Sequence, residues 1–316
     1  MREDAPIQWL LDGDPAIRWQ VHRDLLGAGR REVNAERARV AREGWGRRLL
    51  DRQAANGRWM ATRGPKGAKF RGLYIPKWTS TTYTMLLLAR LGLPEDHPKA
   101  GEGCRALVEG AEWFPSGGLG FFSTHRTAEP CVSAMVLTSL HAFGAEAAAR
   151  ARLERFLLGA QLPDGGWNCV EGATHSSFNT TTAALEALLP RSRSRQVAHA
   201  LARGHEFLLA HRLYRSHRTG RIVKASFTRL RWPVGWETDV LRELHVFVAA
   251  KADRDARLSE AIDRILRHRR ADGRWTCTRP QPGALHFPLE RPGEPSRWVT
   301  LQCLRILRWW NDLATR

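Results

Sequence analysis

Charged amphipathic stretches alternate along the chain with stretches that are apolar on nearly every side. The charged stretches cover residues 34–53, 98–113, 147–160, 195–211 and 257–270. The apolar stretches that follow them cover residues 83–91, 130–143, 176–189, 236–249 and 296–310. A helix that is apolar on all sides is buried on both faces, whereas an amphipathic helix buries one. The pattern therefore predicts five helix pairs, each an outer helix followed by an inner one.

Residues 6–27 predict a further, N-terminal helix pair, in which Asp14 caps the second helix and Pro15 occupies its first turn. No segment with alternating apolar and polar residues predicts a strand. We therefore expect an all-α fold.

A loop signature, Gln-x-x-x-Gly-x-Trp, separates the outer and inner stretches. It occurs in full at Gln53–Trp59 and Gln161–Trp167, and with Arg269 replacing the glutamine before Trp275. A weakened copy covers residues 118–122. The first and last tryptophans give a period of about 54 residues. One such repeat cannot bury its apolar face alone, so neighbouring repeats must pack together.

Five repeats and the N-terminal pair supply about twelve helices, enough to close a double ring. In such an α/α toroid the inner helices surround an axis and the outer helices enclose them. An open solenoid of stacked helix pairs is the alternative. We predict one α/α-toroid domain over residues 1–316, with residues 1–30 closing the ring.

The signature resembles the QW-type motif of the terpenoid cyclases and of protein prenyltransferase β subunits, which share the α/α toroid. The stretches that begin at Lys77, His175 and Pro295 also resemble a bacterial group described as squalene-cyclase-like or prenyltransferase-like. The resemblance implies the fold and an isoprenoid or similar apolar substrate. The motif itself has a structural role, since ring stacking and amide hydrogen bonds tie an outer helix end to its neighbour.

The chain is strongly basic, with 50 Lys and Arg against 32 Asp and Glu and a net charge of +18. This charge favours an anionic partner, which could be nucleic acid, an anionic membrane surface or a phosphorylated substrate. The arginines are scattered over the outer helices and form no compact block, which argues against nucleic acid. Peripheral contact with a membrane stays open.

Cysteine usage indicates a reducing compartment, because five cysteines are an odd number and no CxxC motif occurs. The N-terminus lacks the apolar region of a signal peptide. No apolar run approaches the roughly 18 residues that a membrane span needs. We expect a cytoplasmic protein.

The first turns of the inner helices are the places where a toroid presents chemistry. Glu129 and Cys131 open one inner helix and His175 opens the next. Carboxylate, thiolate and imidazole are the ligands of an open catalytic zinc site, and protein prenyltransferases resemble this arrangement. We predict these three residues as a reactive centre with zinc as the candidate metal, and no other cofactor is indicated. The alternative is that Cys131 is a small buried residue and His175 a helix cap.

A second candidate is a proton-donating carboxyl of the cyclase type. The Asp-x-Asp-Asp motif of class II terpenoid cyclases is absent, so their protonation chemistry is doubtful here. The nearest acids at an inner-helix start are Glu237 and Asp239, and one carboxyl of such a pair can have a raised pKa. The alternative is that both acids stabilise the helix N-terminus by their charge.

The third candidate is an anion site on the loop that precedes the fourth inner helix. Its predicted binding residues are Tyr214, Arg215, His217, Arg218 and Lys224. Arginine binds phosphate through two donors and lysine as a point charge. A solvated basic loop is the alternative. A second basic cluster, Arg63, Lys66, Lys69, Arg71 and Lys77, lies in the first repeat.

Aromatic residues recur near the inner-helix starts, and Trp78, Trp236 and Trp298 are predicted to line an apolar site. Core packing is the alternative for each of them. Cys169 and Cys277 both lie two residues after a signature tryptophan, so we interpret both as packing residues.

The leading hypothesis is an enzyme of the terpenoid-cyclase or prenyltransferase type that holds an isoprenoid in a central cavity. A non-catalytic module with a basic rim for an anionic partner is the second. A carbohydrate-active or lanthionine-forming toroid enzyme is the third. Prenyltransferase β subunits act with a second subunit, and the sequence does not say whether this chain does.

Overall fold

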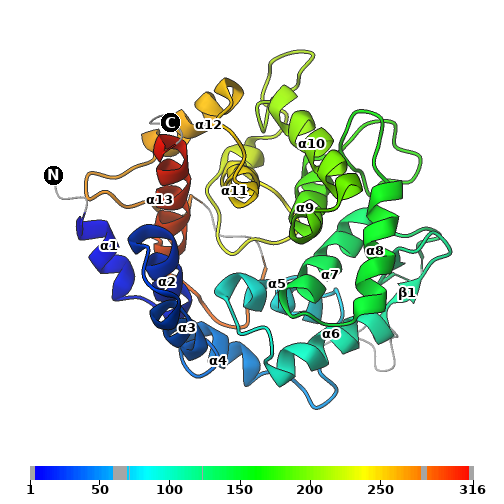
Figure 1. Ribbon diagram of the computed structural model, residues 1–316, viewed down its shortest axis with the longest axis horizontal. Coiled ribbons are helices and arrows are strands. Elements are labelled where there is room, and N and C mark those ends of the chain that lie inside the picture. Colours follow the sequence, from blue (N-terminus) through cyan, green and yellow to red (C-terminus); the bar gives the residue numbers. More distant parts are fainter. Residues whose placement is uncertain (1–3, 60–69, 71, 123, 279–282, 313–316) are drawn as a thin grey trace. The chain divides into compact units, whose positions relative to one another are not determined.

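The computed structural model describes residues 4–59, 70, 72–122, 124–278 and 283–312. These residues form thirteen α-helices, four short 3-10 or π-helical turns and one pair of two-residue strands (Figure 1). The fold class is therefore helical, as the sequence predicts. No described helix is both long enough and apolar enough to cross a membrane.

The inner helices lie where the apolar stretches predict them. They are α5 (Thr81–Leu91), α7 (Pro130–Ala142), α9 (Phe178–Leu188), α11 (Val240–Ala250) and α13 (Arg297–Asp312). Their buried faces are extensive because few positions are polar. In α7, for example, Val132, Met135 and Leu140 are at most 2% exposed.

The outer helices follow the charged stretches with one exception. They are α6 (Pro98–Gly110), α8 (Ala147–Gly159), α10 (Arg195–Ala210) and α12 (Ser259–Arg267). The prediction of one outer helix over residues 34–53 is wrong. Two helices, α3 (Arg30–Arg39) and α4 (Gly44–Leu50), occupy this part of the chain. Gly44 has a φ of +63° at the break, and the Asp14 carboxylate accepts the Trp45 amide at 2.7 Å, which holds the new helix start.

Two compact units make up the chain. One contains Met1–Trp45, Leu208–Pro282 and Pro288–Arg316, and the other contains Gly46–Phe207 and Gly283–Phe287. The prediction of a single domain over 1–316, with residues 1–30 closing a ring, stays a prediction.

In the unit that begins at Gly46, α7 packs between the inner helices α5 and α9 and also contacts the outer helices α6 and α8 (Figure 1). The strands β1 (Glu112–Trp113) and β2 (Leu119–Gly120) form an antiparallel hairpin at the weakened signature. This hairpin is a small departure from the all-helical expectation.

In the other unit, α13 packs against α11 and against the N-terminal helices α1 (Asp4–Leu11) and α2 (Pro15–Val21). Asp14 caps α2 through a 2.9 Å bond from the Ala16 amide, with Pro15 in the first turn. Both features of the predicted N-terminal pair are confirmed.

The three copies of the signature that end in tryptophan make the same tryptophan contacts. The indole Nε1 of the tryptophan donates to a carbonyl ten residues earlier, in the preceding outer helix, at 2.7–2.8 Å. Its backbone amide donates to a threonine hydroxyl of the following inner helix at 3.0–3.1 Å. All three rings are fully buried. The tryptophan therefore joins the two helices of its own pair.

The signature glutamine joins neighbouring pairs. The Gln53 amide donates to Gly57 O within the loop and to Lys99 O of the next outer helix, at 2.9 and 2.8 Å. Gln161 repeats both bonds with Gly165 O and Ala200 O, at 2.7 and 2.9 Å. The amide hydrogen bonds predicted for the motif are confirmed, and the predicted ring stacking stays a prediction.

The signature glycine has to be a glycine for two reasons. Gly165 has a φ of +97°, and a Cβ there would lie 2.5 Å from the carbonyl oxygen of Arg203. We expect Gly165→Ala to lower the free energy of unfolding by about 1–3 kcal/mol, measured by urea denaturation. Gly172, with a φ of +71° and open space around its Cβ position, is the matched control and should cost about 1 kcal/mol as alanine. Equal losses for the two variants would contradict the steric argument.

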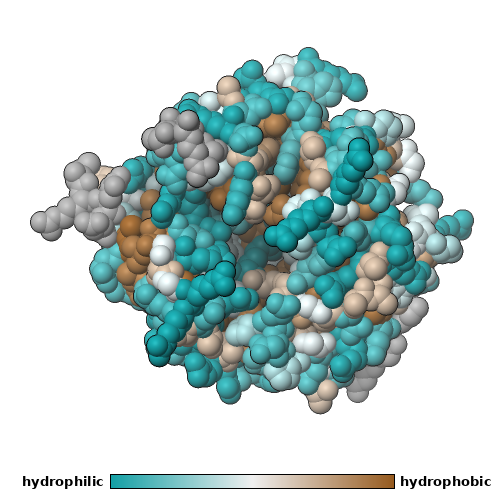
Figure 2. Space-filling view, viewed as in Figure 1, coloured by the Kyte–Doolittle hydropathy of each residue, from teal (hydrophilic) through white to brown (hydrophobic). Residues whose placement is uncertain are grey.

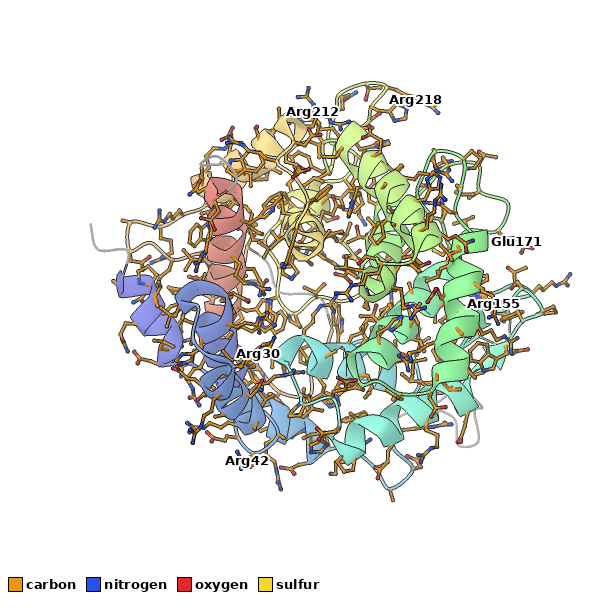
Figure 3. All side chains as sticks on the ribbon, viewed as in Figure 1. Arg30, Arg42, Arg155, Glu171, Arg212 and Arg218 are labelled. Atoms are coloured by element: carbon orange, nitrogen blue, oxygen red, sulfur yellow. The ribbon has the colours of Figure 1, made fainter. Side chains whose placement is uncertain are left out.

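Hydrophilic residues cover most of the face seen in Figure 2. Arg30, Arg42 and Arg155, which are labelled in Figure 3, are exposed. The basic excess is thus largely a solvated surface.

Candidate functional site

Glu129 is the residue immediately before α7 and makes no capping bond to that helix. Pro130 occupies the first turn and directs the preceding chain out of the helix. The carboxyl is 16% exposed, and its Oε2 lies 3.2 Å from Nδ1 of His125. Burial raises the pKa of Glu129, and His125 only partly offsets this effect. The result is a half-buried carboxyl paired with an imidazole.

An aromatic cluster lies near this carboxyl. Tyr74 lies at its centre, with ring centroids 5.4 Å from Tyr83, 5.4 Å from Phe122 and 6.3 Å from Phe121. The Tyr83 hydroxyl donates to the Tyr74 hydroxyl at 3.2 Å. Burial raises the pKa of Tyr74 well above its usual value, with smaller contributions from Tyr83, Cys131 and Glu129. Glu129 therefore lies close enough to this cluster for its charge to act on the phenol.

Phe122 extends the cluster to His125, with ring centroids 4.8 Å apart. Phe122 is half-buried and His125 is exposed. The site thus combines a carboxyl, an imidazole and the partly exposed ring of Phe122.

Cys131 is the second residue of α7 and lies near a second cysteine. Its thiol interacts with that of Cys169, which follows the signature of the next repeat. This interaction lowers the pKa of Cys169 to about 6, and together with burial it raises the pKa of Cys131. Both cysteines are free thiols. The interpretation of Cys169 as a packing residue stays a prediction.

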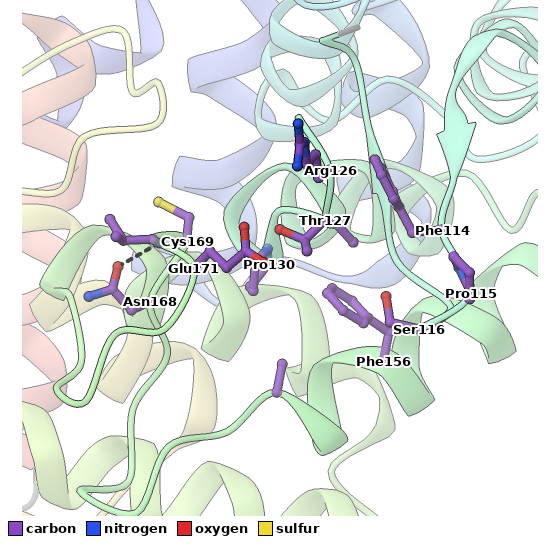
Figure 4. A pocket seen from close by; sticks show the side chains of 13 residues that line it. Phe114, Pro115, Ser116, Arg126, Thr127, Pro130, Phe156, Asn168, Cys169 and Glu171 are labelled. Carbon is purple, nitrogen blue, oxygen red and sulfur yellow. Dashed lines mark hydrogen bonds between the residues drawn. The ribbon is translucent and has the colours of Figure 1, made fainter. Parts of the chain in front are cut away.

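A cavity of about 380 Å³ opens beside this cysteine pair (Figure 4). Ala128 and Pro130, on either side of Glu129, line it together with Cys169. Its opposite wall is formed by Phe114, Pro115, Ser116 and Phe156. The cavity therefore adjoins the start of α7 and the loop that carries Cys169.

His175, the third predicted zinc ligand, is exposed, and its carbonyl accepts a 2.8 Å bond from the Asn168 side chain. No described contact joins its ring to Glu129 or Cys131. Within the described ranges, no three His, Cys, Asp or Glu side chains come together in a way that could hold a metal ion. The zinc site of Glu129, Cys131 and His175 stays a prediction.

The acids before α11, in the other unit, are engaged in bonds within the protein. The Asp239 carboxylate caps α11 by accepting the amides of Arg242 at 2.9 Å and Arg231 at 3.2 Å. Glu237 pairs with Arg231 at 2.6 Å and with Lys224 at 3.5 Å. Burial would raise the pKa of Glu237, but these two cations outweigh it and the net pKa is lowered. The catalytic role of Glu237 and Asp239 stays a prediction, and their observed contacts are structural.

Asp239 and Glu243 are the buried carboxyls of α11, one turn apart on the same face. Burial raises the pKa of Asp239 to about 6 despite the bonds from Arg242 and Arg231, and it raises the pKa of Glu243 well above its usual value. Glu243 was not among the predicted site residues. Its one-turn spacing from Asp239 in a predicted inner helix was the signal.

Stability should respond to pH through Asp239. Its pKa rises from 3.8 in the unfolded chain to about 6 in the fold, so its contribution is fully present below about pH 4 and is lost as the pH rises through about 6. The loss is on the order of 2–3 kcal/mol. Asp239→Asn keeps a capping side chain and should reduce the fall in stability between about pH 4 and pH 7 by that amount. Urea unfolding of both proteins at the two pH values measures this, and parallel pH profiles would contradict it.

The predicted anion loop is largely bonded to its own unit. Arg215 makes a two-pronged ion pair with Glu260 at 2.7 and 2.6 Å, and Tyr214 is fully buried. Lys224 is the cation already paired with Glu237. His217 contacts His211 at 2.7 Å in an exposed position, and Arg218 points into solvent (Figure 3).

Anion binding by this loop stays a prediction. His217 and Arg218 are the residues of the loop that could bind an anion without breaking an ion pair of the fold. In the second basic cluster, Arg63, Lys66, Lys69 and Arg71 lie outside the described residues.

The three predicted tryptophans have separate surroundings. Trp78 is 7% exposed and packs on Tyr83 with a centroid distance of 5.4 Å, which attaches it to the aromatic cluster. Trp298 stacks on Trp232 at 3.7 Å and 13°, within the other unit. Trp236 is half-buried, and its carbonyl accepts a 3.4 Å bond from Arg242. Trp78 is thus the one of the three that belongs to the aromatic cluster of Tyr74 and Tyr83.

Sequence reasoning did not select Tyr74, His125 or the Cys169 thiol. His125 lies four residues before Glu129, a spacing that brings side chains together on a helix but here spans a loop. Tyr74 lies in the basic loop before an inner helix. The lysines and arginines of that loop predict an anion site and do not indicate a role for a single tyrosine.

The repeated tryptophan contacts and the paired helices define a fold of the terpenoid-cyclase type. Among solved structures, a protein from Actinoplanes is similar over 97% of this chain and 98% of its own, with a TM-score of 0.50 and 18% identity. The type II terpene cyclase MstE from Scytonema, in complex with its substrate geranylgeranyl dihydroxybenzoate, is similar over 98% of this chain and 96% of its own, with a TM-score of 0.50 and 16% identity.

No family model matches the sequence, and no curated protein matches it. The structural likeness confirms the predicted fold class. At this level of identity it concerns the fold alone.

Proposed function

We propose that this chain is an isoprenoid-converting enzyme of the terpene-cyclase type, with Glu129 as its proton donor. The observation that carries the proposal is the half-buried Glu129 carboxyl, which contacts His125 at 3.2 Å beside the Tyr74 and Phe122 rings. The likeness in fold to a cyclase that binds a geranylgeranyl substrate supports the substrate class.

The chemistry follows from the surroundings of the carboxyl. Partial burial favours the neutral acid, which can give a proton to a carbon–carbon double bond. A positive charge on His125 would stabilise the carboxylate left behind, so the imidazole strengthens the acid. Aromatic faces attract the resulting carbocation by cation–π interaction, and the partly open Phe122 ring is the nearest such face to His125.

The reaction is then an isomerisation. The Glu129 proton adds to one alkene carbon, a further double bond of the substrate closes a ring on the cation, and a proton leaves the last cation to restore an alkene. Proton uptake equals proton loss, so product and substrate have the same mass. No phosphate group has to leave.

The test is to incubate the purified protein with a geranylgeranyl chain carried on an aromatic acid and, separately, with geranylgeranyl diphosphate. The expected result is a cyclised isomer detected by mass-resolved chromatography, with any diphosphate retained. Release of diphosphate would replace the proposal with prenyl transfer or ionisation chemistry. Tight binding without conversion would support the second candidate, a non-catalytic module. No specific observation favours a carbohydrate-active or lanthionine-forming enzyme.

A further inference from the structure

A second pocket, of about 750 Å³, is lined by three helical segments of a single compact unit. They are the π-helical turn η1 (His22–Leu26), the last turn of α11 with its C-cap Lys251, and the C-terminal half of α13. In this unit α13 packs against both η1 and α11 (Figure 1). Small-molecule sites commonly occupy about 300–1,000 Å³, so the pocket is large enough for such a ligand.

Cations outnumber carboxylates in the lining of this pocket. The lining includes four cationic and two acidic side chains, an excess of two positive charges: Arg23, Lys251, Arg305 and Arg308 against Asp24 and Asp312. Charge of one sign in a concave surface attracts a small ion of the opposite sign more strongly than the same charge on a flat one. The lining therefore favours an anion.

One carboxylate balances two of these arginines. The Arg23 Nε donates to Asp24 Oδ1 at 2.6 Å, and the Arg305 Nε lies 2.9 Å from Asp24 Oδ2. The Arg305 side chain is only 13% exposed, and burial lowers its pKa to about 10, which still leaves it charged at neutral pH. A buried cation that shares its counter-ion is compensated only in part by the fold.

Arg308 is held at the pocket mainly by backbone groups. Its Nη1 donates to the carbonyl oxygens of Asp24 and Leu25 at 3.0 and 2.6 Å, and its Nε lies 3.7 Å from Asp312. Among the residues that the structure describes, none accepts a hydrogen bond from its Nη2. A guanidinium has five N–H donors in a fixed plane, so Arg308 is positioned by the fold and keeps donors for a ligand.

Lys251 occupies a backbone position that normally favours glycine. It ends α11 with a φ of +51°, and its amide donates to the carbonyls of Phe247 and Val248. Its exposed side chain forms neither a hydrogen bond nor an ion pair with the described part of the chain. A side chain with a Cβ is disfavoured in this conformation, and no contact within the fold explains a lysine here. Its alternative role is a favourable interaction with the C-terminal end of the helix dipole.

The rest of the lining is apolar. It consists of Val248, Ala249 and the half-buried Trp309. The Trp309 Nε1 donates to Ala252 O at 3.1 Å, which fixes the indole ring. A pocket with cationic donors and an apolar wall suits an anionic group that is attached to an organic body.

We propose that this pocket binds a small molecule that carries a phosphate or diphosphate group. The Lys251 ammonium and the Arg308 guanidinium supply the donors, because these are the groups that commonly bind phosphate. Arg23 and Arg305 add positive charge that Asp24 balances only in part. Glu129 lies in the other compact unit, so this binding does not depend on the proposed cyclase activity.

The test titrates the full chain with inorganic diphosphate by isothermal calorimetry at about 0.15 M salt, where attraction to scattered surface charge is largely screened. The expected result is one diphosphate bound per chain. Lys251→Gly should bind it about tenfold more weakly, because one charge-assisted contact is lost. Glycine adopts a positive φ without strain, so the urea midpoint of this variant should not fall. Lys251→Arg keeps the charge and should retain most of the affinity.

Arg212→Gly is the matched control. Arg212 is an exposed cation of the same compact unit, it has a φ of +44°, and it does not line the pocket. The variant therefore removes the same charge from the same kind of backbone position. It should bind diphosphate as tightly as the wild type does.

Four results would overturn the proposal. The first is that the wild type does not bind diphosphate. The second is that Lys251→Gly binds it as tightly as the wild type, because Lys251 would then serve only the helix end. The third is that Arg212→Gly loses as much affinity as Lys251→Gly, which would show a general effect of net charge. The fourth is that the wild type binds phosphatidic acid vesicles but not soluble diphosphate, which would make the pocket part of a membrane-binding surface.

Discussion

Trp167→Ala is expected to lower the free energy of unfolding by about 3–5 kcal/mol, the range for removing a large buried aromatic ring. The Trp167 ring is fully buried, its Nε1 bonds Leu157 O at 2.7 Å, and its amide bonds the Thr181 hydroxyl at 3.0 Å. Alanine leaves a cavity between α8 and α9 and removes the indole hydrogen bond to the outer helix. Because Trp59 and Trp275 make the same contacts, their alanine variants should lose similar amounts.

Urea denaturation followed by circular dichroism measures this loss. Trp113 is the control, because its ring is half-buried against Arg152 and its Nε1 bonds Val108 O at 2.9 Å outside the full signature. We expect Trp113→Ala to lose clearly less than Trp167→Ala. Losses below about 1 kcal/mol for all three signature variants would show that the motif does not hold the helix pairs together.

Glu129→Gln is expected to lower the rate of isoprenoid cyclisation by about 10²–10⁴-fold, the usual contribution of a positioned general acid. Glutamine has nearly the shape of glutamic acid but no proton of comparable acidity, so substrate binding should be retained. The measurement is the initial rate of isomer formation at saturating substrate, with binding followed separately by calorimetry.

Glu171→Gln is the matched control for Glu129→Gln. Glu171 is an exposed acid beside the nearby cavity (Figure 3), and it lies outside the aromatic cluster. Its variant should turn over at the wild-type rate. If Glu129→Gln kept the wild-type rate, or if Glu171→Gln lost as much, the acid would have to be a different residue.

Much of the fold was predictable because its determinants are local. The five inner helices follow from runs that are apolar on every side, and the signature contacts follow from a motif repeated with the same spacing. The break at Gly44 was not predictable, because it depends on a bond from Asp14, which lies thirty-one residues before Trp45 in the chain. Local periodicity carries no information about such a contact.

The candidate site shows the same division. The position of Glu129 at an inner-helix start could be inferred from the repeat. The ion pair between Arg215 and Glu260 could not be inferred, because these residues lie forty-five positions apart in the sequence and meet only in the folded chain. Cys169 and Cys277 share a repeat position, which suggested identical packing, yet their tertiary neighbours differ.

The central claim is that Glu129 starts a cyclisation by donating a proton that comes from solvent. The most direct measurement runs the reaction in D₂O and compares wild type with Glu129→Gln. The account predicts a cyclised product that carries one carbon-bound deuterium and is formed only at a trace rate by the variant. A product without deuterium, or one formed equally fast by both proteins, would contradict it.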